Sequence, residues 1–399
     1  MVSNVRRRSV ALLPVFALLP LAGLLTGCWD RHEINDVAFV VGTAVDKEGD
    51  QYRFSVQIPL PGQMSGNKGG GGGTTGQKTW HMVSEVAQSP MMALAEGQEF
   101  SSRQVNVSHR RMFIIGEKAA REGILPLLDG VARAPQNRLT TFVVVAEGPA
   151  SRVLSTHVPL EQLPSEIIRE QTIMFMRRPP TLKHVANILL GHGRDLMLPC
   201  VSVASFTFPG QKEETQAIRV HKLAVFRDDR LIAFTDSRIG RGLLIASGQS
   251  KGHPVAVPAP TGSGYINMMF HNFRSSISPV VQGNRVKIRI NVRGYGTVVE
   301  NNSAFVIHRP GALDKLEQML NESVKQDIEA AVQWLKEHRS DALGFGEAIH
   351  AYRPAVWHRI AKDWLDVFRD IEVEVISQLK VENIGYNRSP FGREEDGLR

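Results

Sequence analysis

Cysteine is the most nucleophilic residue type in this 399-residue chain, and only two cysteines occur. Cys28 directly follows an apolar run and two small residues, and a tryptophan and a group of charged residues come after it. A cysteine thiolate at such a position, between an apolar run and a charged segment, is suited to covalent modification. Cys200 lies instead in the apolar, strand-like sequence Leu-Met-Leu-Pro-Cys-Val-Ser-Val, where a lone cysteine is most often a small buried hydrophobic residue.

The residues before Cys28 have the three-part pattern of an export signal. Three arginines at 6–8 are followed by an apolar run at 10–25 and by the small residues Thr26 and Gly27. The run is shorter than the about 20 residues of a comfortable membrane span, and two prolines interrupt its helix. Residues 25–28, Leu-Thr-Gly-Cys, resemble the lipobox of bacterial lipoproteins, in which diacylglycerol alkylates the cysteine before cleavage. We expect residues 1–27 to be a lipoprotein signal peptide and Cys28 to hold lipid, since two acyl chains give a stable anchor.

The composition is that of a globular protein with a modest positive charge. Hydrophobic residues make up 42% and charged residues 22%, and the length suits two or three domains. The formal charge is +7, of which residues 6–8 supply three. The remaining surplus is spread along the chain, whereas a nucleic-acid partner requires basic residues clustered on one face. We therefore expect no nucleic-acid partner, and weak attraction to an anionic membrane surface is compatible with the charge.

The sequence contains none of the common enzyme or metal motifs, such as HExxH, CxxC or G-x-S-x-G. A glycine-rich run at 66–76 is not a phosphate-binding loop, because Gln77 separates Gly76 from Lys78, and we expect an exposed loop. The basic cluster Ser-His-Arg-Arg at 108–111 is interpreted as the entry to a strand with solvated charges. We expect no catalytic residue, no metal and no cofactor beyond the lipid on Cys28, and hence no enzyme activity.

Strands and helices alternate through the first half of the mature chain. Residues 103–147 have a β-α-β pattern, and residues 84–100 have helical spacing with Pro90 either as a kink or as the first residue of the helix. We expect an N-terminal α+β domain over 28–208, and a division of it near residue 150 is compatible with the pattern. The polar stretch 209–216, which begins with Pro-Gly, is expected to be a linker.

The second half has longer strands and a long helix. Val286, Ile288 and Ile290 alternate with polar residues, as in a strand with one wet face. From 313 to 335, apolar residues recur every three or four positions and form one helical stripe. We expect a C-terminal α+β domain over 217–386 and a polar tail over 387–399. The fold class is α+β: a multi-domain ectodomain of mixed or antiparallel sheets with flanking helices, preceded by the signal peptide.

Residues 27–46, Gly-Cys-Trp-Asp-Arg-His-Glu-Ile-Asn-Asp and the following hydrophobic strand, resemble the opening of the Ger(x)C family, the C-subunit lipoproteins of spore germination receptors. In that family the lipid-bearing cysteine is followed by Trp-Asp, a basic residue, Glu-Ile or Glu-Leu, and Asn-Asp. The likeness continues in order through the mature chain, at 101–124, 143–154, 223–234, Glu300 and 341–368. The glycine-rich insert at 66–76 is longer than the family pattern.

The resemblance implies a lipid-anchored protein on the outer face of the inner spore membrane. It would be one of three subunits of a nutrient-germinant receptor, beside two integral membrane subunits, of which the transporter-like one is expected to hold the nutrient. We therefore expect a non-catalytic subunit that serves receptor assembly or signalling. The alternative is a solute-binding lipoprotein that captures a small nutrient itself, which requires a closed cleft with converging polar groups that the sequence does not display.

Two groups of residues follow from this interpretation. A short tether would keep the segment after Cys28 close to the membrane and to neighbouring subunits, and the expected contact residues are Trp29, Asp30, Arg31, Glu33, Asn35 and Asp36. A second set matches the family motifs and is expected to be structural: Glu300, Asp341, Phe345, Gly346, Trp357 and Trp364. Glu300 and Asp341 could be catalytic carboxylates by type, but neither has a second partner at a readable spacing. For residues 341–347 a helix cap and turn is favoured over a binding surface.

Overall fold

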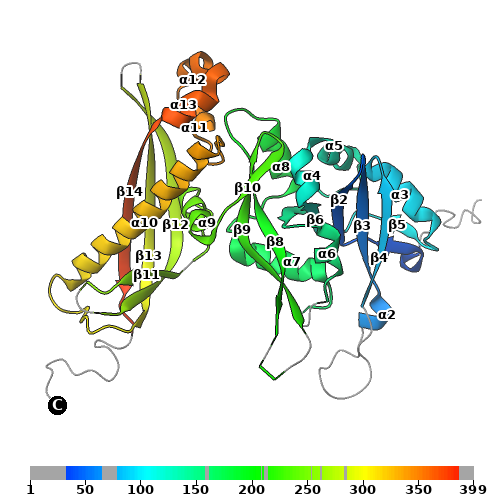
Figure 1. Ribbon diagram of the computed structural model, residues 1–399, viewed down its shortest axis with the longest axis horizontal. Coiled ribbons are helices and arrows are strands. Elements are labelled where there is room, and N and C mark those ends of the chain that lie inside the picture. Colours follow the sequence, from blue (N-terminus) through cyan, green and yellow to red (C-terminus); the bar gives the residue numbers. More distant parts are fainter. Residues whose placement is uncertain are drawn as a thin grey trace, which may run out of the picture.

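The computed structural model of the chain describes residues 33–64, 79–157, 161–207, 209–210, 214–252, 254–260, 263–282 and 285–385 (Figure 1). The expected signal peptide, Cys28, the glycine-rich run 66–76 and the polar tail 387–399 lie outside the described residues. The fold class predicted from the sequence is confirmed, because helices flank two main sheets of mixed strand direction in a multi-domain arrangement.

An eight-stranded mixed sheet forms the centre of the N-terminal domain. In spatial order its strands are β10 (Arg230–Phe234), β9 (Thr215–Arg227), β8 (Met197–Phe206), β7 (Phe142–Ala146), β6 (Met112–Gly116), β2 (Gly42–Glu48), β3 (Gln51–Pro59) and β4 (Trp80–Ala87). The central strands β8, β7, β6 and β2 are parallel, and the outer pairs at both ends are antiparallel. Strands β6 and β7 are almost continuously apolar and buried, as parallel strands covered on both faces must be.

Helices cover both faces of this sheet (Figure 1). One face packs against α3 (Pro90–Glu99), α4 (Glu117–Glu122), α5 (Leu125–Arg133) and α8 (Leu182–Leu189), whose buried side chains share a core with Phe113 and Phe226. The opposite face packs against α6 (Ala150–Ser155) and α7 (Pro164–Phe175). The short elements beside the sheet are η1 (Ile34–Asp36), α2 (Pro61–Met64) and the parallel pair of β1 (Val37–Phe39) with β5 (Gln104–Asn106).

The start of α3 settles the two interpretations of Pro90. Residues 84–87, expected to be helical, belong to β4 because they continue its ladder with β3. The helix begins at Pro90, where the missing N–H costs nothing, and Ser89 caps it by accepting a hydrogen bond from the Met92 amide at 3.3 Å. Pro90 therefore starts the helix and does not kink it.

The stretch 209–216, expected to be an interdomain linker, connects two strands of one sheet. β8 and β9 pair antiparallel from Met197 with Val225 to Phe206 with Thr215. Strands β9 and β10, which the sequence assigned to the C-terminal domain, thus complete the N-terminal sheet, and that sheet ends at Phe234. The physical reason is that a hairpin turn and a linker have the same polar, Pro/Gly-rich composition.

A four-stranded sheet forms the C-terminal domain. In spatial order its strands are β11 (Pro254–Pro258), β12 (Tyr265–Gln282), β13 (Arg285–Asn301) and β14 (Glu372–Asn383), with β13 and β14 parallel and the other neighbours antiparallel. The predicted alternation in β13 is confirmed: Ile288 and Ile290 are fully buried. On the other face, Lys287 and Arg289 form ion pairs with Glu372 and Glu374 of β14, so this face is the wet one.

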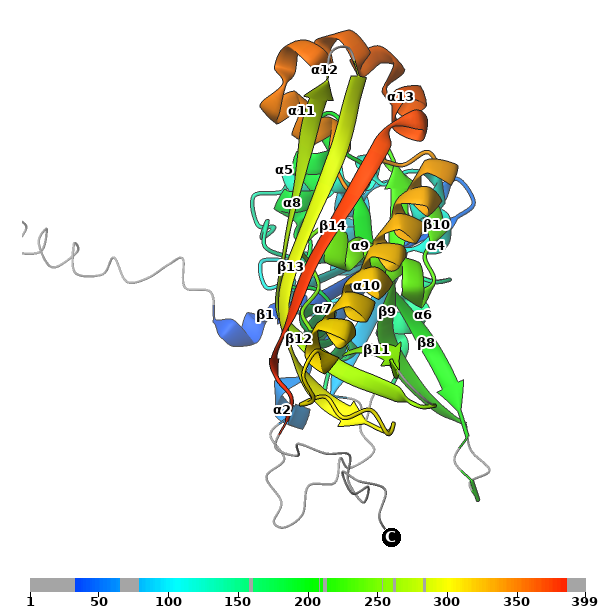
Figure 2. The same cartoon turned by 90° about the vertical axis from the view of Figure 1, so that its left-hand side faces the viewer.

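Helices α9 (Ser237–Ala246) and α10 (Ala312–Glu337) cover the apolar face, and α10 runs obliquely across the strands (Figure 2). The predicted stripe of α10 is confirmed, because Leu316, Leu320, Val324, Ile328, Ala331 and Leu335 are all buried. At one end of the sheet lie α11 (Phe345–Tyr352), α12 (Pro354–Ile360), η2 (Ala361–Asp363) and α13 (Trp364–Asp370). Within the ranges given above, no helix combines the length and the apolar character needed to cross a membrane.

The two domains share one hydrophobic core. Met197, Leu223 and Val225 of the N-terminal sheet belong to the same buried cluster as Leu335 and Phe345 of the C-terminal domain. Packing of this kind is the main stabilising contribution in domain cores, so the two domains form a continuous body and not two beads on a flexible chain.

Candidate functional site

The first described residues form an exposed segment ahead of β1. Glu33, Asn35 and Asp36 are exposed, and the Asp36 amide donates to the Glu33 carbonyl at 3.0 Å, which closes the single turn of η1. Ile34 lies between them with 79% of its surface exposed, which is unusual for an isoleucine. The remaining expected contact residues, Trp29, Asp30 and Arg31, lie outside the described residues together with Cys28.

Asp341 is the best connected of the motif residues. It follows α10 and is only 1% exposed. Its Oδ1 accepts the Phe345 amide at 2.8 Å, while its Oδ2 accepts the Gly346 amide at 2.7 Å and the Trp364 indole N–H at 3.1 Å. One carboxylate thus satisfies two free amides in the first turn of α11 and fixes α13 beside it, which is the geometry of a helix cap.

Asp195 connects the corner formed by Asp341, α11 and α13 to the N-terminal domain. Its Oδ2 accepts the Asp341 amide at 2.8 Å, its Oδ1 accepts the Asp228 amide at 2.9 Å, and its own amide donates to the Asp341 carbonyl at 3.0 Å. Beside it, the Ser340 hydroxyl donates to the Phe226 carbonyl at 2.6 Å. The segment before β8, the turn between β9 and β10, and the segment after α10 therefore meet in one hydrogen-bonded network.

Burial dominates the electrostatics of both carboxylates. It raises the pKa of Asp341 to about 8, although the Gly346 and Phe345 amides favour the charged form, and the nearby Asp195 raises it further. Burial likewise raises the pKa of Asp195 above its ordinary range, against the hydrogen bonds from the Asp228 and Asp341 amides. All four carboxylate oxygens accept hydrogen bonds from the chain itself, so neither acid is available to a substrate as the site stands.

The other motif residues pack around this network. Gly193 and Gly346 are in direct contact, and the Glu347 amide donates to the Gly193 carbonyl at 2.7 Å. Trp357 and Trp364 pack edge to face with ring centroids 5.4 Å apart, and Phe345 is fully buried. Five of the six predicted motif residues are therefore brought together: Asp341, Phe345, Gly346, Trp357 and Trp364.

Glu300 is the exception. It is exposed near the end of β13, and its carboxylate accepts hydrogen bonds from Tyr265 Oη at 3.1 Å and Asn267 Nδ2 at 2.6 Å, both on the neighbouring strand β12. These contacts join two strands and do not extend to the corner of Asp341.

A polar cleft of about 750 Å³ lies at the domain junction. Its walls include Asp195, Asp228 and Arg339, together with residues of η2 and α13 such as Lys362 and Asp366. The N-terminal and C-terminal domains both contribute to these walls, so a change in how the domains meet would alter the cleft.

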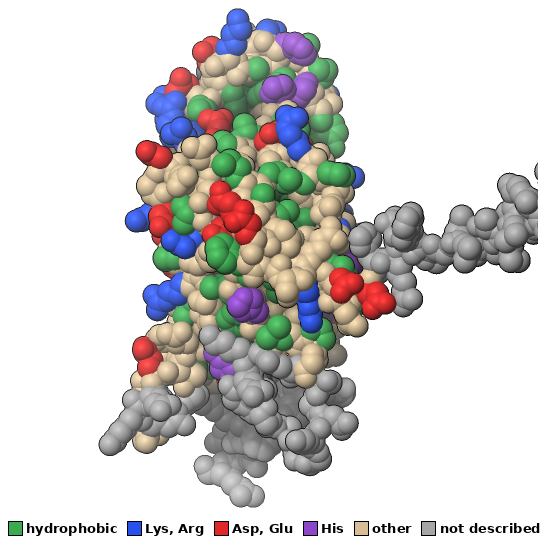
Figure 3. Space-filling model, turned by 90° about the vertical axis from the view of Figure 1, so that its right-hand side faces the viewer, with side chains coloured by type: hydrophobic (Ala, Val, Ile, Leu, Met, Phe, Trp, Pro, Cys, Tyr) green, Lys and Arg blue, Asp and Glu red, His purple; other side chains and the backbone are tan. Residues whose placement is uncertain are grey.

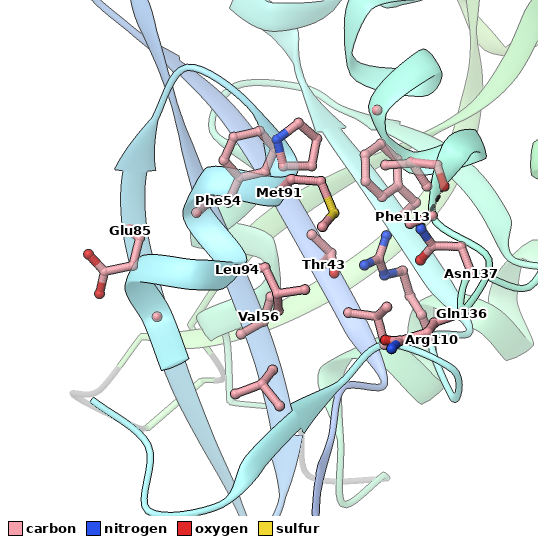
Figure 4. A pocket seen from close by; sticks show the side chains of 18 of the residues that line it. Thr43, Phe54, Val56, Glu85, Met91, Leu94, Arg110, Phe113, Gln136 and Asn137 are labelled. Atoms are coloured by element: carbon pink, nitrogen blue, oxygen red, sulfur yellow. Dashed lines mark hydrogen bonds between the residues drawn. The ribbon is translucent and has the colours of Figure 1, made fainter. Parts of the chain in front are cut away.

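The sequence interpretation of residues 108–111 as solvated charges is wrong for Arg110. Its side chain is only 7% exposed, and it lies in an apolar cavity of about 410 Å³ between α3, α5 and the sheet (Figure 4). Burial lowers the pKa of Arg110 to about 10. His109 and Arg111, on either side of Arg110, are more exposed, so an alternation of exposed and buried residues was the signal that could have indicated its burial. The residues that bury Arg110 belong to distant segments of the chain.

Neither cysteine chemistry nor a metal centre is apparent in the described part of the chain. Cys200 is fully buried, as predicted, and burial raises the pKa of its thiol to about 12, so the reactive thiolate is suppressed. Within that same part, no group of three or more His, Cys, Asp or Glu residues is arranged to hold a metal ion.

Comparison with known proteins accounts for nearly the whole chain. The family described as "Spore germination protein N-terminal domain" matches residues 30–203, and "Spore germination B3/ GerAC like, C-terminal" matches residues 221–385. The putative spore germination protein YfkR of Bacillus subtilis strain 168 is 37% identical over 363 residues, which cover 91% of this chain and 94% of that protein. The chain belongs to the Ger(x)C family.

More distant Ger(x)C relatives match over similar lengths. Spore germination protein KC of the same organism is 24% identical over 95% of this chain and 97% of that protein. The crystal structure of the GerBC protein matches with a TM-score of 0.57 and 17% identity, over 89% of this chain and all of that one, which shows a shared fold. The gap between the two family matches, residues 204–220, lies where β8 is followed by β9. The boundary between the two family matches therefore falls before β10, the last strand of the eight-stranded sheet in sequence.

Proposed function

We propose that this Ger(x)C chain is a lipid-anchored, non-catalytic subunit of a spore nutrient-germinant receptor that serves receptor assembly or signalling. Membership in the family over both domains carries the proposal. In this arrangement Cys28 holds the lipid, the protein lies on the outer face of the inner spore membrane, and two integral membrane subunits are its partners.

The geometry of the N-terminal segment is compatible with a contact surface close to the membrane. Glu33 is five positions after Cys28, a distance that a fully extended chain spans in at most about 17 Å, so η1 would lie close to the lipid headgroups. Ile34 offers an exposed apolar side chain there, between the polar residues Glu33, Asn35 and Asp36. Anchoring raises the effective concentration of such a surface toward the membrane subunits, so weak contacts suffice for assembly.

A non-catalytic role agrees with the occupied state of the buried carboxylates. Asp195 and Asp341 direct their oxygens at amides of the chain and hold two domains together. A general acid or base must reach a substrate proton, and these groups are committed elsewhere.

The proposal is tested by replacing Cys28 with Ala in the sporulating host, with Cys200→Ala as the matched cysteine control, since Cys200 is buried. Incorporation of a labelled fatty acid, membrane fractionation and germination with the host's nutrients are followed. We expect Cys28→Ala to lose the lipid and nutrient germination while a non-nutrient trigger still works, and Cys200→Ala to retain all three. A Cys28→Ala protein that still takes up lipid, or spores that germinate normally with it, would contradict the proposal.

A further inference from the structure

The N-terminal domain contains a small, partly open apolar cavity between two helices and the sheet. Its volume is about 410 Å³, within the range of small-molecule sites. Val56 of β3 and the helix residues Met91 and Leu94 form one side, and Phe113 of β6 lies opposite (Figure 4). The cavity belongs to the end of the molecule that carries α3 and β4, where hydrophobic side chains are exposed between charged ones (Figure 3).

One unpaired charge is directed into this apolar space. The guanidinium of Arg110 extends into the middle of the cavity, toward Thr43 and Phe113 (Figure 4). Its centre lies 5.7 Å from the Phe113 ring, but its Nε and Nη1 have no hydrogen-bond partner in the described structure. A buried guanidinium with two unsatisfied nitrogens is costly, and an anion with two oxygens in one plane would satisfy both of them.

The other charged residues of the cavity wall do not supply that anion. Figure 4 shows the Glu85 carboxylate on the far side of β4, directed away from Arg110. Arg133 pairs with Asp129 at 2.8 Å, and 78% of its side chain is exposed. Among the described residues of the wall, Arg110 is thus the single unpaired buried charge, so the complementary ligand carries one negative charge and not two.

Two neutral polar atoms complete the site. Thr43 Oγ1 and Asn137 Oδ1 are buried without a partner in the described structure, although Asn137 Nδ2 donates to the Val131 carbonyl at 2.6 Å. These two uncharged atoms can form hydrogen bonds with a ligand. Among the described residues that line the cavity, no carboxylate faces inward to balance an ammonium group. The lining therefore favours a simple carboxylate over a zwitterionic amino acid.

We propose that this cavity binds a small monocarboxylate with an apolar body, whose carboxylate pairs with Arg110 while its hydrocarbon part lies between α3 and β3. The cavity is partly open, and the polar groups that converge in it are of the kind that a solute-binding site requires. The inference does not rest on the proposed receptor role, because binding to the purified protein is independent of lipid anchoring and of germination.

The test uses the full chain purified in detergent and three probes of equal chain length: hexanoate, 1-hexanol and norleucine. Isothermal titration measures each affinity. We expect hexanoate to bind at millimolar concentration or below, and 1-hexanol and norleucine each to bind about tenfold more weakly, since they lack the anion or add an unbalanced ammonium. Absence of hexanoate binding, equal binding of 1-hexanol, or tighter binding of norleucine would overturn the proposal.

Variants locate the binding site. Arg110→Gln is expected to weaken hexanoate about tenfold or more, while the neighbouring Arg111→Gln, which removes only an exposed pair with Glu166, leaves the affinity within about twofold. Because Arg110→Gln could impair folding, Ala93→Leu provides a second variant that fills the cavity and keeps Arg110. The melting temperature of each variant is measured first. Folded Arg110→Gln or Ala93→Leu protein that binds hexanoate like the unaltered chain places the ligand elsewhere and refutes the assignment.

Discussion

The amide of Asp341 donates to Asp195 Oδ2 at 2.8 Å, and the amide of Asp195 donates back to the Asp341 carbonyl at 3.0 Å. These residues are 146 positions apart and belong to the two domains. This reciprocal pair satisfies the backbone amides of both residues. Together with the shared apolar core, it stabilises the junction between the two domains. A displacement of the β9–β10 turn would therefore be transmitted to α11 and α13 through Asp195 and Asp341.

The first prediction concerns the pH dependence of stability at this junction. The pKa of Asp341 in the folded protein is raised to about 8 from an ordinary value of 3.8, so the folded state retains a proton that the unfolded state releases. The stabilising contribution is thus complete below pH 3.8 and is lost as the pH rises through about 8. We expect the denaturation free energy to fall by on the order of 1–3 kcal/mol between about pH 5 and pH 8.

Asp341→Asn separates this effect from other titrations, because an amide does not titrate in this range. Above about pH 8 the variant should be less stable than the unaltered chain, since its NH2 group faces N–H donors that the carboxylate accepts. Its stability should change less between about pH 5 and pH 8. Asp363→Asn, an exposed substitution in the same corner, should keep the slope of the unaltered chain. Chemical denaturation at a series of pH values gives the slopes, and an unchanged slope in Asp341→Asn would count against a titrating Asp341.

The second prediction concerns the contact between Gly193 and Gly346. A Cβ at Gly193 would lie 2.6 Å from the Gly346 carbonyl carbon and 2.8 Å from both the Glu347 amide nitrogen and a Trp357 ring atom. Backbone atoms cannot yield at such distances, and the φ of +77° adds strain for any other residue. Gly193→Ala should therefore separate the two segments, lower the stability and change the fluorescence of Trp357.

Gly148→Ala is the matched control for Gly193→Ala. Gly148 has a φ of +87°, and a Cβ at this position would meet no described atom within 4 Å, so its substitution tests backbone strain alone. We expect thermal unfolding to show a loss of stability of about 1–2 kcal/mol for Gly148→Ala, and a loss about 2 kcal/mol larger for Gly193→Ala. Equal losses of stability in the two variants would show that the close approach of Gly193 to Gly346 adds nothing to the backbone strain.

Much of the fold was predictable because its pattern is local. The stripe of α10 and the alternation of β13 repeat every few residues, and burial of one side enforces them. The pairing of β9 and β10 with the eight-stranded sheet was not readable from the sequence, because strand partners are chosen by long-range pairing. A polar turn does not reveal whether it joins strands or domains.

The candidate site was predictable only in part. Asp341, Phe345, Gly346, Trp357 and Trp364 cluster within 24 residues of sequence, so their grouping was readable as a motif. Asp195 and Gly193 carry no local pattern, and their roles depend on partners about 150 residues away. Arg110 was misjudged for the same reason, since the helices that bury it are formed by other segments of the chain.

The third prediction concerns Asp327, which holds α9 against α10. Its carboxylate accepts from Arg238 Nε at 2.8 Å and from Arg241 Nε and Nη2 at 3.0 and 2.7 Å, and its side chain is only 6% exposed. Asp327→Ala would leave two arginines facing each other without an anion. Both arginines are partly exposed, so water screens them, and we expect a loss of about 2–3 kcal/mol, below the usual value for a fully buried pair.

Glu329→Ala, two residues further along α10, supplies the comparison. Glu329 forms an exposed pair with Lys325 at 3.9 Å, and its removal should cost less than about 0.5 kcal/mol. Raising the salt concentration should abolish the small Glu329 effect but leave most of the Asp327 effect, because partly buried pairs are poorly screened. Both variants are compared by chemical denaturation at low and high salt. If Asp327→Ala were as mild and as salt-sensitive as Glu329→Ala, the contact between α9 and α10 would depend on apolar packing alone.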